Sequence, residues 1–272
     1  MESCILLHNH LYQSSEILID NIKKLLDKLH ISIVRTESLT LDDKFLPFIE
    51  PISYFKPIIT LLHKAHEEGQ RVLICDTQSL LVVAKLLKKL YENSEFREAM
   101  NEACACNIDI LNLENSFVFA PEIVFDAIKV AEIKQRRWES FKCAFVFDRE
   151  LEEYIKESQI LLRAESITGL KILPFFKNSY AYLLQSNPEL AYKMAAMDYY
   201  EMVDCGIDFI ITPNIGNFEL MDKHTKALQD ISGRDTAEIP LLFVPQVILA
   251  LFMDTKAEFL GFDSHKIRPQ ML

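Results

Sequence analysis

The chain has 272 residues, of which 50% are hydrophobic and 25% are charged. This apolar content excludes a disordered chain, because a disordered segment buries too little surface to offset the entropy lost on ordering. The formal net charge of −11 argues against general binding of nucleic acid, which needs clustered Lys and Arg to neutralise phosphates. The longest apolar run, Ile239–Phe252, contains two prolines and is too short to insert into a membrane.

The predicted elements alternate between short apolar strands and amphipathic helices. Because parallel strands need long crossover connections, this alternation predicts parallel sheets with flanking helices and an α/β fold. The first half is predicted to contain strands Cys4–Leu7, Ile31–Val34 and Arg71–Cys75 and helices Ser15–Leu29, Ile58–Glu68 and Ser79–Tyr91. The second is predicted to contain helices Glu150–Ala164 and Glu189–Asp204, strand Phe209–Thr212 and a helix beginning near Phe218.

An internal repeat orders these elements. Four segments recur in the same order along the chain, which predicts two tandem, similar α/β halves, each with a small parallel sheet flanked by helices. The charged stretch 129–142 separates them, so the halves are assigned to residues 1–135 and 136–272. The matches pair Cys4–His8 with Cys143–Phe147, the Pro47 turn with Pro174, Glu68–Ile74 with Cys205–Ile211, and Phe117–Val124 with Leu241–Ile248.

The six cysteines form no C-x-x-C motif and no adjacent pair, and the closest two are Cys104 and Cys106. Such spacing supports neither a ribbon-type zinc site nor a thioredoxin-like redox motif. The N-terminal residues lack the pattern of a signal peptide, since an acidic residue precedes a short apolar stretch broken by polar residues. We therefore expect a cytoplasmic protein with reduced thiols.

One segment carries a family resemblance. Residues 206–217 read Gly-Ile-Asp-Phe-Ile-Ile-Thr-Pro-Asn-Ile-Gly-Asn, which resembles the G-A-D-x-I-x-T-P-C-P-x-C segment of the cysteine-rich, CCG-domain family that includes the B subunit of heterodisulfide reductase. The resemblance continues through residues 239–251 and ends in Phe259–Lys266, where His265 matches a histidine of the family. It implies a duplicated α/β fold, a redox complex and an iron–sulfur cluster.

The chain departs from that family at the cluster ligands. The resemblance implies, for each functional half, a Cys near the first strand, a Cys-Cys pair after the second and a C-x-x-C after the third. Asn214 and Asn217 occupy the C-x-x-C positions of the second half. In the first half, two registers stay open: either Cys75 and Gln78 or Asp76 and Ser79. Because amide side chains replace soft thiolates poorly, we expect the cluster and any cofactor to be absent.

These observations favour a non-catalytic, cluster-less relative of the heterodisulfide reductase B subunit. It would act as a scaffold or accessory component of a redox complex, with a flavoprotein or iron–sulfur subunit as partner. One alternative is an active electron-transfer protein whose atypical iron–sulfur or metal site uses Cys75, Cys104 and Cys106. Another is a protein that binds a small anion in a crevice at the strand ends. No catalytic residue is assigned, and whether the chain is an enzyme stays open. The candidate anion-binding residues are Thr212, Asn214, Gly216, Asn217, Asp76, Gln78 and Ser79.

Overall fold

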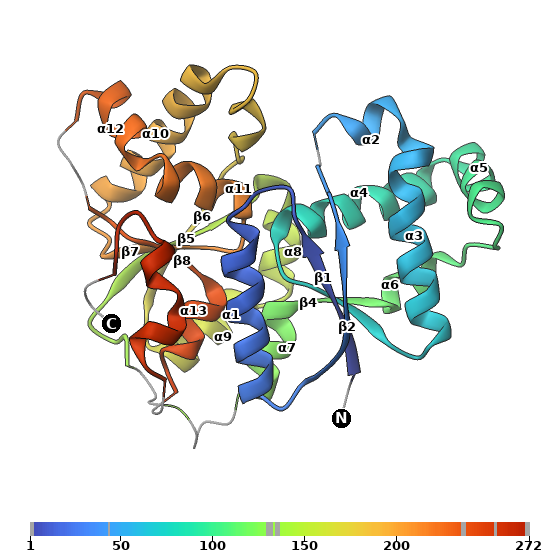
Figure 1. Cartoon of the computed structure of the whole chain (residues 1–272), viewed down its shortest axis with the longest axis horizontal. Helices are drawn as coiled ribbons and strands as arrows, with labels where there is room; N and C mark the ends of the chain where they lie inside the picture. The colour runs from blue at the N-terminus through green and yellow to red at the C-terminus, as the bar shows by residue number, and fades with distance from the viewer. Residues whose placement is uncertain are drawn as a thin grey trace.

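Two four-stranded parallel sheets form the framework (Figure 1). The computed structural model describes residues 3–42, 44–128, 133, 137–234, 238–252 and 255–269. The strand orders are β2-β1-β3-β4 and β6-β5-β7-β8, so the two sheets share one topology and the predicted α/β fold with two similar halves is confirmed. The boundary expected between residues 135 and 136 lies outside the described residues. The strands are β1 Ser3–Asn9, β2 Ser32–Leu39, β3 Arg71–Ile74, β4 Phe117–Phe119, β5 Lys142–Phe147, β6 Lys171–Phe176, β7 Phe209–Thr212 and β8 Leu241–Phe243.

Helices connect the strands and cover both sheets. In the first half they are α1 Ser15–Lys28, α2 Leu46–Ile49, α3 Pro51–Glu67, α4 Thr77–Glu92, α5 Ser94–Cys104, α6 Ile110–Asn115 and α7 Ala120–Ala127. In the second half they are α8 Glu152–Glu157, α9 Ile160–Thr168, α10 Pro188–Asp204, α11 Ile215–Phe218, α12 Thr225–Ser232 and α13 Val244–Leu249. Short 3₁₀ turns lie at Arg149–Leu151, Ala181–Leu183, Ala257–Leu260 and Phe262–Ser264, and a π-helical turn lies at Glu219–Lys223.

Local sequence explains most of these elements. Helix α1 buries Leu18, Ile22 and Leu25 at helical spacing and coincides closely with its prediction. The single helix expected over residues 150–164 is instead broken, because Gln159 takes a left-handed backbone conformation with φ 56° between α8 and α9. The helix expected from near Phe218 begins at Ile215 and passes through the π-helical turn before α12.

The register of the two sheets tests the repeat residue by residue. Cys4 pairs with Arg71 in the first sheet and Cys143 pairs with Phe209 in the second, so β1 corresponds to β5 and β3 to β7. The third predicted match is therefore off by one residue, because it placed Arg71 opposite Asp208. Strands β4 and β8 also correspond, as the fourth predicted match requires. The match of Pro47 with Pro174 is wrong. Pro47 lies in the first turn of helix α2, whereas Pro174 lies in β6, an edge strand where a missing N–H is tolerated.

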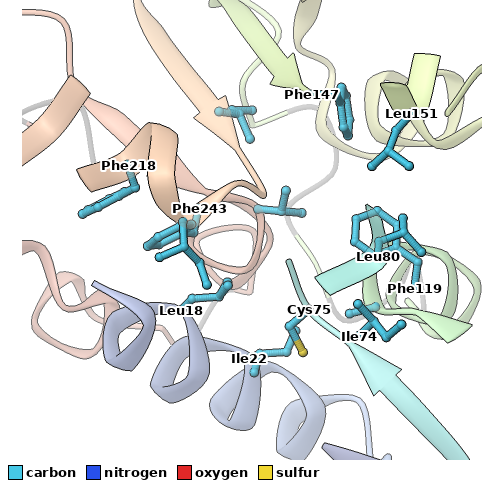
Figure 2. Packing of buried hydrophobic residues seen from close by; sticks show 14 of the residues in the cluster. Leu18, Ile22, Ile74, Cys75, Leu80, Phe119, Phe147, Leu151, Phe218 and Phe243 are labelled. Atoms are coloured by element: carbon cyan, nitrogen blue, oxygen red, sulfur yellow. The ribbon is translucent and has the colours of Figure 1, made fainter. Parts of the chain in front are cut away.

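The two halves pack against each other through the helices that lie between the sheets (Figure 1). Helix α1 of the first half packs on α13 of the second, and α9 of the second half packs on α7 of the first. Figure 2 shows Leu18 and Ile22 of α1 reaching toward Phe243 of β8 and Cys75 of the first half. Their buried side chains belong to one apolar cluster that extends through both halves. The strand-end loops of the two sheets are thereby held against each other.

Candidate functional site

The loops that follow β3 and β7 meet between the two halves. The backbone N–H of Thr77 donates to the carbonyl oxygen of Pro213 across 3.2 Å. Each loop runs directly into a helix, α4 in the first half and α11 in the second. The predicted anion-binding residues lie on these two loops or on the strand end and first helical turns beside them, and they are buried, so the structure brings them together inside the molecule.

In the first half, Asp76 caps helix α4. Its Oδ1 accepts from the backbone N–H of Ser79 at 2.8 Å, and its Oδ2 accepts from the Ser79 hydroxyl at 2.6 Å. Asn9, the last residue of β1, also hydrogen-bonds this carboxyl group. Burial raises the pKa of Asp76 to about 6, although the hydrogen bonds from Ser79 and Asn9 act in the opposite direction.

In the second half, Asn214 caps helix α11. Its Oδ1 accepts from the backbone N–H of Asn217 at 2.8 Å. Its Nδ2 donates to both carboxylate oxygens of Asp148, at 2.9 and 2.8 Å, and Asp148 directly follows strand β5. Thr212 supports the turn, because its Oγ1 accepts from the Asn214 backbone N–H at 3.0 Å and donates to the Val146 carbonyl at 3.2 Å.

The sheet register decides which residues correspond. Because Arg71 corresponds to Phe209, Asp76 corresponds to Asn214 and Ser79 to Asn217. Asp76 and Ser79 are therefore the counterparts of Asn214 and Asn217, whereas Cys75 and Gln78 correspond to Pro213 and Gly216. The same alignment places Asn9 opposite Asp148. Each half thus pairs one carboxylate with one amide, but in opposite order.

Gly216 is required by close packing. A Cβ atom there would lie 2.6 Å from the Ser179 hydroxyl oxygen and 2.9 Å from the Ala181 Cβ. Real side chains do not approach that closely, so the turn leaves room for glycine alone. Its counterpart in the first half is Gln78, which has a full side chain.

The cysteines singled out from the sequence lie in two places. Cys75 follows β3 in the buried core, where burial raises the pKa of its thiol well above the ordinary value. Cys104 ends α5 in the outer layer against α3, and Cys106 follows after the left-handed Ala105. Burial also raises the pKa of Cys104. Within the described ranges, no three His, Cys, Asp or Glu side chains lie close enough together to hold a metal ion.

The donor groups at the strand ends do not fit an iron–sulfur cluster. Such clusters are held by thiolates. The four C-x-x-C positions carry a carboxylate, a hydroxyl and two amides, and Asp76, Ser79 and Asn214 are engaged in hydrogen bonds of the helix caps. Cys75, the nearest thiol in sequence, is the residue before the cap rather than a member of it.

Three buried polar atoms at these loops lack a hydrogen-bond partner among the described residues. They are Oγ1 of Thr77, Oε1 of Gln78 and Nδ2 of Asn217. A buried polar group without a partner costs about 1–3 kcal/mol, so a small polar molecule that reached them would be favoured. A hollow of about 560 Å³ beside α12 and Lys266 is lined by residues of neither loop. Binding of a small anion at the loops therefore remains a prediction.

A second cluster of buried polar side chains surrounds His265. The sequence did not predict which residues contact this histidine. Gln246 donates from Nε2 to the His265 Nε2 at 2.8 Å, because its Oε1 accepts from the Phe243 backbone N–H. The His265 Nε2 is thus an acceptor, which places the ring proton on Nδ1. The Nδ1 nitrogen lies 3.7 Å from Oδ1 of Asp222. Burial lowers the pKa of His265 to about 4 and raises that of Asp222 to about 6. Asp222 also accepts from the Lys266 backbone N–H at 3.0 Å, so this group holds the C-terminal segment in place.

No described helix combines the length and the apolar character needed to cross a membrane. The candidate site is a buried junction between the two α/β halves, where the loops at the carboxyl ends of their parallel strands meet.

Comparison with known proteins places this architecture. Residues 180–266 match the family model described as HdrB-like C-terminal domain. The match confirms, for that part of the chain, the resemblance to the heterodisulfide reductase B subunit that the sequence indicated. A comparison with curated proteins finds no match.

Solved structures extend the comparison to the whole chain. A crystal structure of a hypothetical protein from Helicobacter pylori superposes with a TM-score of 0.80 at 22% identity and covers 100% of this chain, which spans 53% of that protein. This likeness shows the fold alone. A carbohydrate transporter solute-binding protein from Agrobacterium radiobacter, in complex with D-arabinose, reaches a TM-score of 0.23 at 10% identity, covering 88% of this chain and 91% of that one. That score is too low to support an argument.

Proposed function

We propose that this protein is a cluster-less relative of the heterodisulfide reductase B subunit that acts in the cytoplasm as a non-catalytic scaffold or accessory component of a redox complex. The partner would be a flavoprotein or an iron–sulfur protein. The match of residues 180–266 to the HdrB-like C-terminal domain supports the relationship.

The observation that carries the proposal is the chemistry of the two helix caps. At the positions where the resemblance implies cluster cysteines, Asp76 and Asn214 instead form buried hydrogen bonds that begin helices α4 and α11. The strand-end residues Asn9 and Asp148 complete these interactions. The polar groups that replace the thiols thus support the fold, and a retained fold without ligands suits a role in assembly.

Anaerobic reconstitution tests this proposal. The purified chain is incubated with ferrous iron, sulfide and a thiol reductant, desalted, and examined by visible absorbance and electron paramagnetic resonance. We expect no iron–sulfur absorption to stay with the protein. A retained chromophore that is lost in the Cys75→Ser, Cys104→Ser, Cys106→Ser triple variant would contradict the proposal and favour the electron-transfer alternative.

A small-anion site is the second candidate, and the three unpartnered atoms of Thr77, Gln78 and Asn217 favour it. Isothermal titration with inorganic phosphate and with acetate tests it directly. Saturable binding that is lost in Asn217→Ala but kept in Asn93→Ala, a cap variant on α5, is the expected result. Equal heats for the wild type and both variants would contradict it.

A further inference from the structure

Helix α2 presents an apolar surface to solvent. Phe45, Leu46, Phe48 and Ile49 are 52%, 43%, 73% and 70% exposed, although they lie within five consecutive residues. We call these four side chains the α2 ridge. Its backbone is anchored, because Pro47 is buried and α2 packs on α3. Contiguous apolar patches on a protein surface mark interaction sites more often than chance exposure does.

A basic groove runs beside the α2 ridge. It has a volume of about 420 Å³, and its lining includes Phe48 and Phe55 together with Lys85, Lys88 and Lys89 of α4. Glu92 is the one acidic residue among the described residues that line it. Because Glu150 lies 3.3 Å from Lys85, the three lysines of the groove face two carboxylates, those of Glu92 and Glu150. One positive charge is left over in a chain whose net charge is −11.

The lysines are positioned to meet an incoming charge. The Lys88 side chain is 72% exposed and lies 3.9 Å from Glu92, an exposed ion pair that stabilises little. The Nζ of Lys89 lies 4.7 Å from the centre of the Phe96 ring, a cation–π contact. Lys85 contacts Glu150 of the second half at 3.3 Å. The groove therefore lies close to the junction of the two halves.

We infer that the α2 ridge and the adjacent groove bind an acidic amphipathic helix of a protein partner. Phe48 and Ile49 would contact the apolar stripe of that helix, and the lysines of α4 would face its carboxylates. A second copy of this chain is disfavoured as the occupant, because two chains of charge −11 repel each other. The inference rests on the proposed function as an accessory component and specifies the chemistry of its partner.

Two designed peptides serve as probes. Both carry Leu at positions i, i+3, i+4 and i+7 of a helix, and the remaining positions are mainly Glu in one and Lys in the other. Binding to the full chain is measured by fluorescence anisotropy at two salt concentrations, and the contact surface by amide chemical shifts. We expect the Glu peptide to bind at the residues of α2 and α4, about tenfold more tightly than the Lys peptide, and to weaken as salt rises.

Surface variants make the test specific. Phe48→Ser with Ile49→Ser is expected to abolish binding of the Glu peptide, and Lys88→Glu with Lys89→Glu to weaken it about tenfold and to favour the Lys peptide. Leu162→Ser, which alters an exposed apolar side chain of α9, is the matched control and should change nothing. Absence of Glu-peptide binding, or binding that survives the Phe48 and Ile49 changes, would overturn the inference.

Two further measurements address the other occupants. Self-association through the α2 ridge in sedimentation, or binding to vesicles of anionic phospholipid that Phe48→Ser with Ile49→Ser removes, would also overturn it. This test can fail independently of the test of the proposed function, because no cysteine is among the described residues that line the groove. A chain that binds the Glu peptide yet retains an iron–sulfur cluster would contradict the proposed function and leave the docking surface standing.

Discussion

The two strand-end junctions of this molecule both cap the helix that follows a strand, but they place the carboxylate and the amide at opposite positions. In the first half the carboxylate of Asp76 caps the helix and the amide of Asn9 ends the strand, whereas in the second half Asn214 caps the helix and Asp148 directly follows the strand. Each junction keeps one carboxylate and one amide in contact. The comparison teaches that the helix-cap geometry is common to both halves while the location of the buried charge differs.

The difference extends to the space around each turn. Gly216 of the second half fits against Ser179 and Ala181 with no room for a Cβ atom, whereas the corresponding residue of the first half, Gln78, has a full side chain. The second junction is therefore the more tightly packed of the two.

Exchanging these two residues gives the largest expected effect. Gly216→Gln should lower the free energy of unfolding by about 3 kcal/mol because the side chain must displace Ser179 and Ala181. The reverse change, Gln78→Gly, should cost about 1 kcal/mol through the poor helix propensity of glycine. Urea unfolding followed by circular dichroism measures both. If Gly216→Gln does not fold, Gly216→Ala adds a smaller side chain at the same position. A loss of unfolding free energy at Gly216 no larger than that of Gln78→Gly would contradict the tighter packing of the second junction.

Removing the second cap is expected to have an effect of similar size. Asn214→Ala loses a helix cap and both hydrogen bonds to the Asp148 carboxylate, for a total of about 3 kcal/mol. Asn93→Ala is the matched control, since Asn93 caps α5 in the same way at an exposed position, where its Oδ1 accepts from the Phe96 backbone N–H. It should cost about 1 kcal/mol. Similar losses of unfolding free energy in the two variants would show that the Asp148 contact contributes nothing.

The pH dependence of Asp76→Asn is the smallest expected effect and tests the charge difference. The pKa of Asp76 is about 6 in the folded chain against an ordinary value of 3.8. As pH rises, the Asp76 carboxyl group therefore loses its proton at a lower pH in the unfolded state than in the folded state. Between these values the folded state loses relative stability as pH rises, and above pH 6 the cost is constant. Asn carries no such proton. The stability of Asp76→Asn relative to wild type should therefore increase by about 2 kcal/mol from pH 4.5 to pH 7.5. A difference that is independent of pH would contradict the burial of this charge.

The sequence predicted the fold where apolar patterns are long and the repeat is visible. Helices α1 and α10 and strand β7 coincide closely with their predicted ranges. The correspondence of β2 with β6 was missed, and the Pro47 turn was matched instead. Both β2 and β6 are edge strands with partly exposed side chains, and they share only a short polar-Ile-aliphatic start, Ser32–Val34 and Lys171–Leu173. The break at Gln159 was also missed, because a single left-handed residue leaves no periodic signal.

The candidate site could be predicted only in part. The residues of both loops followed from the resemblance, but the register of the first loop stayed open between Cys75 and Asp76. The pairing of β1 with β3 decides it, and that pairing is a long-range property of the sheet. The contacts of Asp76 with Asn9 and of Asn214 with Asp148 depend on the same pairing, as does the placement of Gln246 against His265.

The measurement that tests the central claim most directly is the iron and acid-labile sulfide content of the anaerobically purified chain. If polar helix caps have replaced the cluster ligands, the protein will be colourless and both contents will be far below one atom per chain. A brown protein with stoichiometric iron and sulfide would contradict the account.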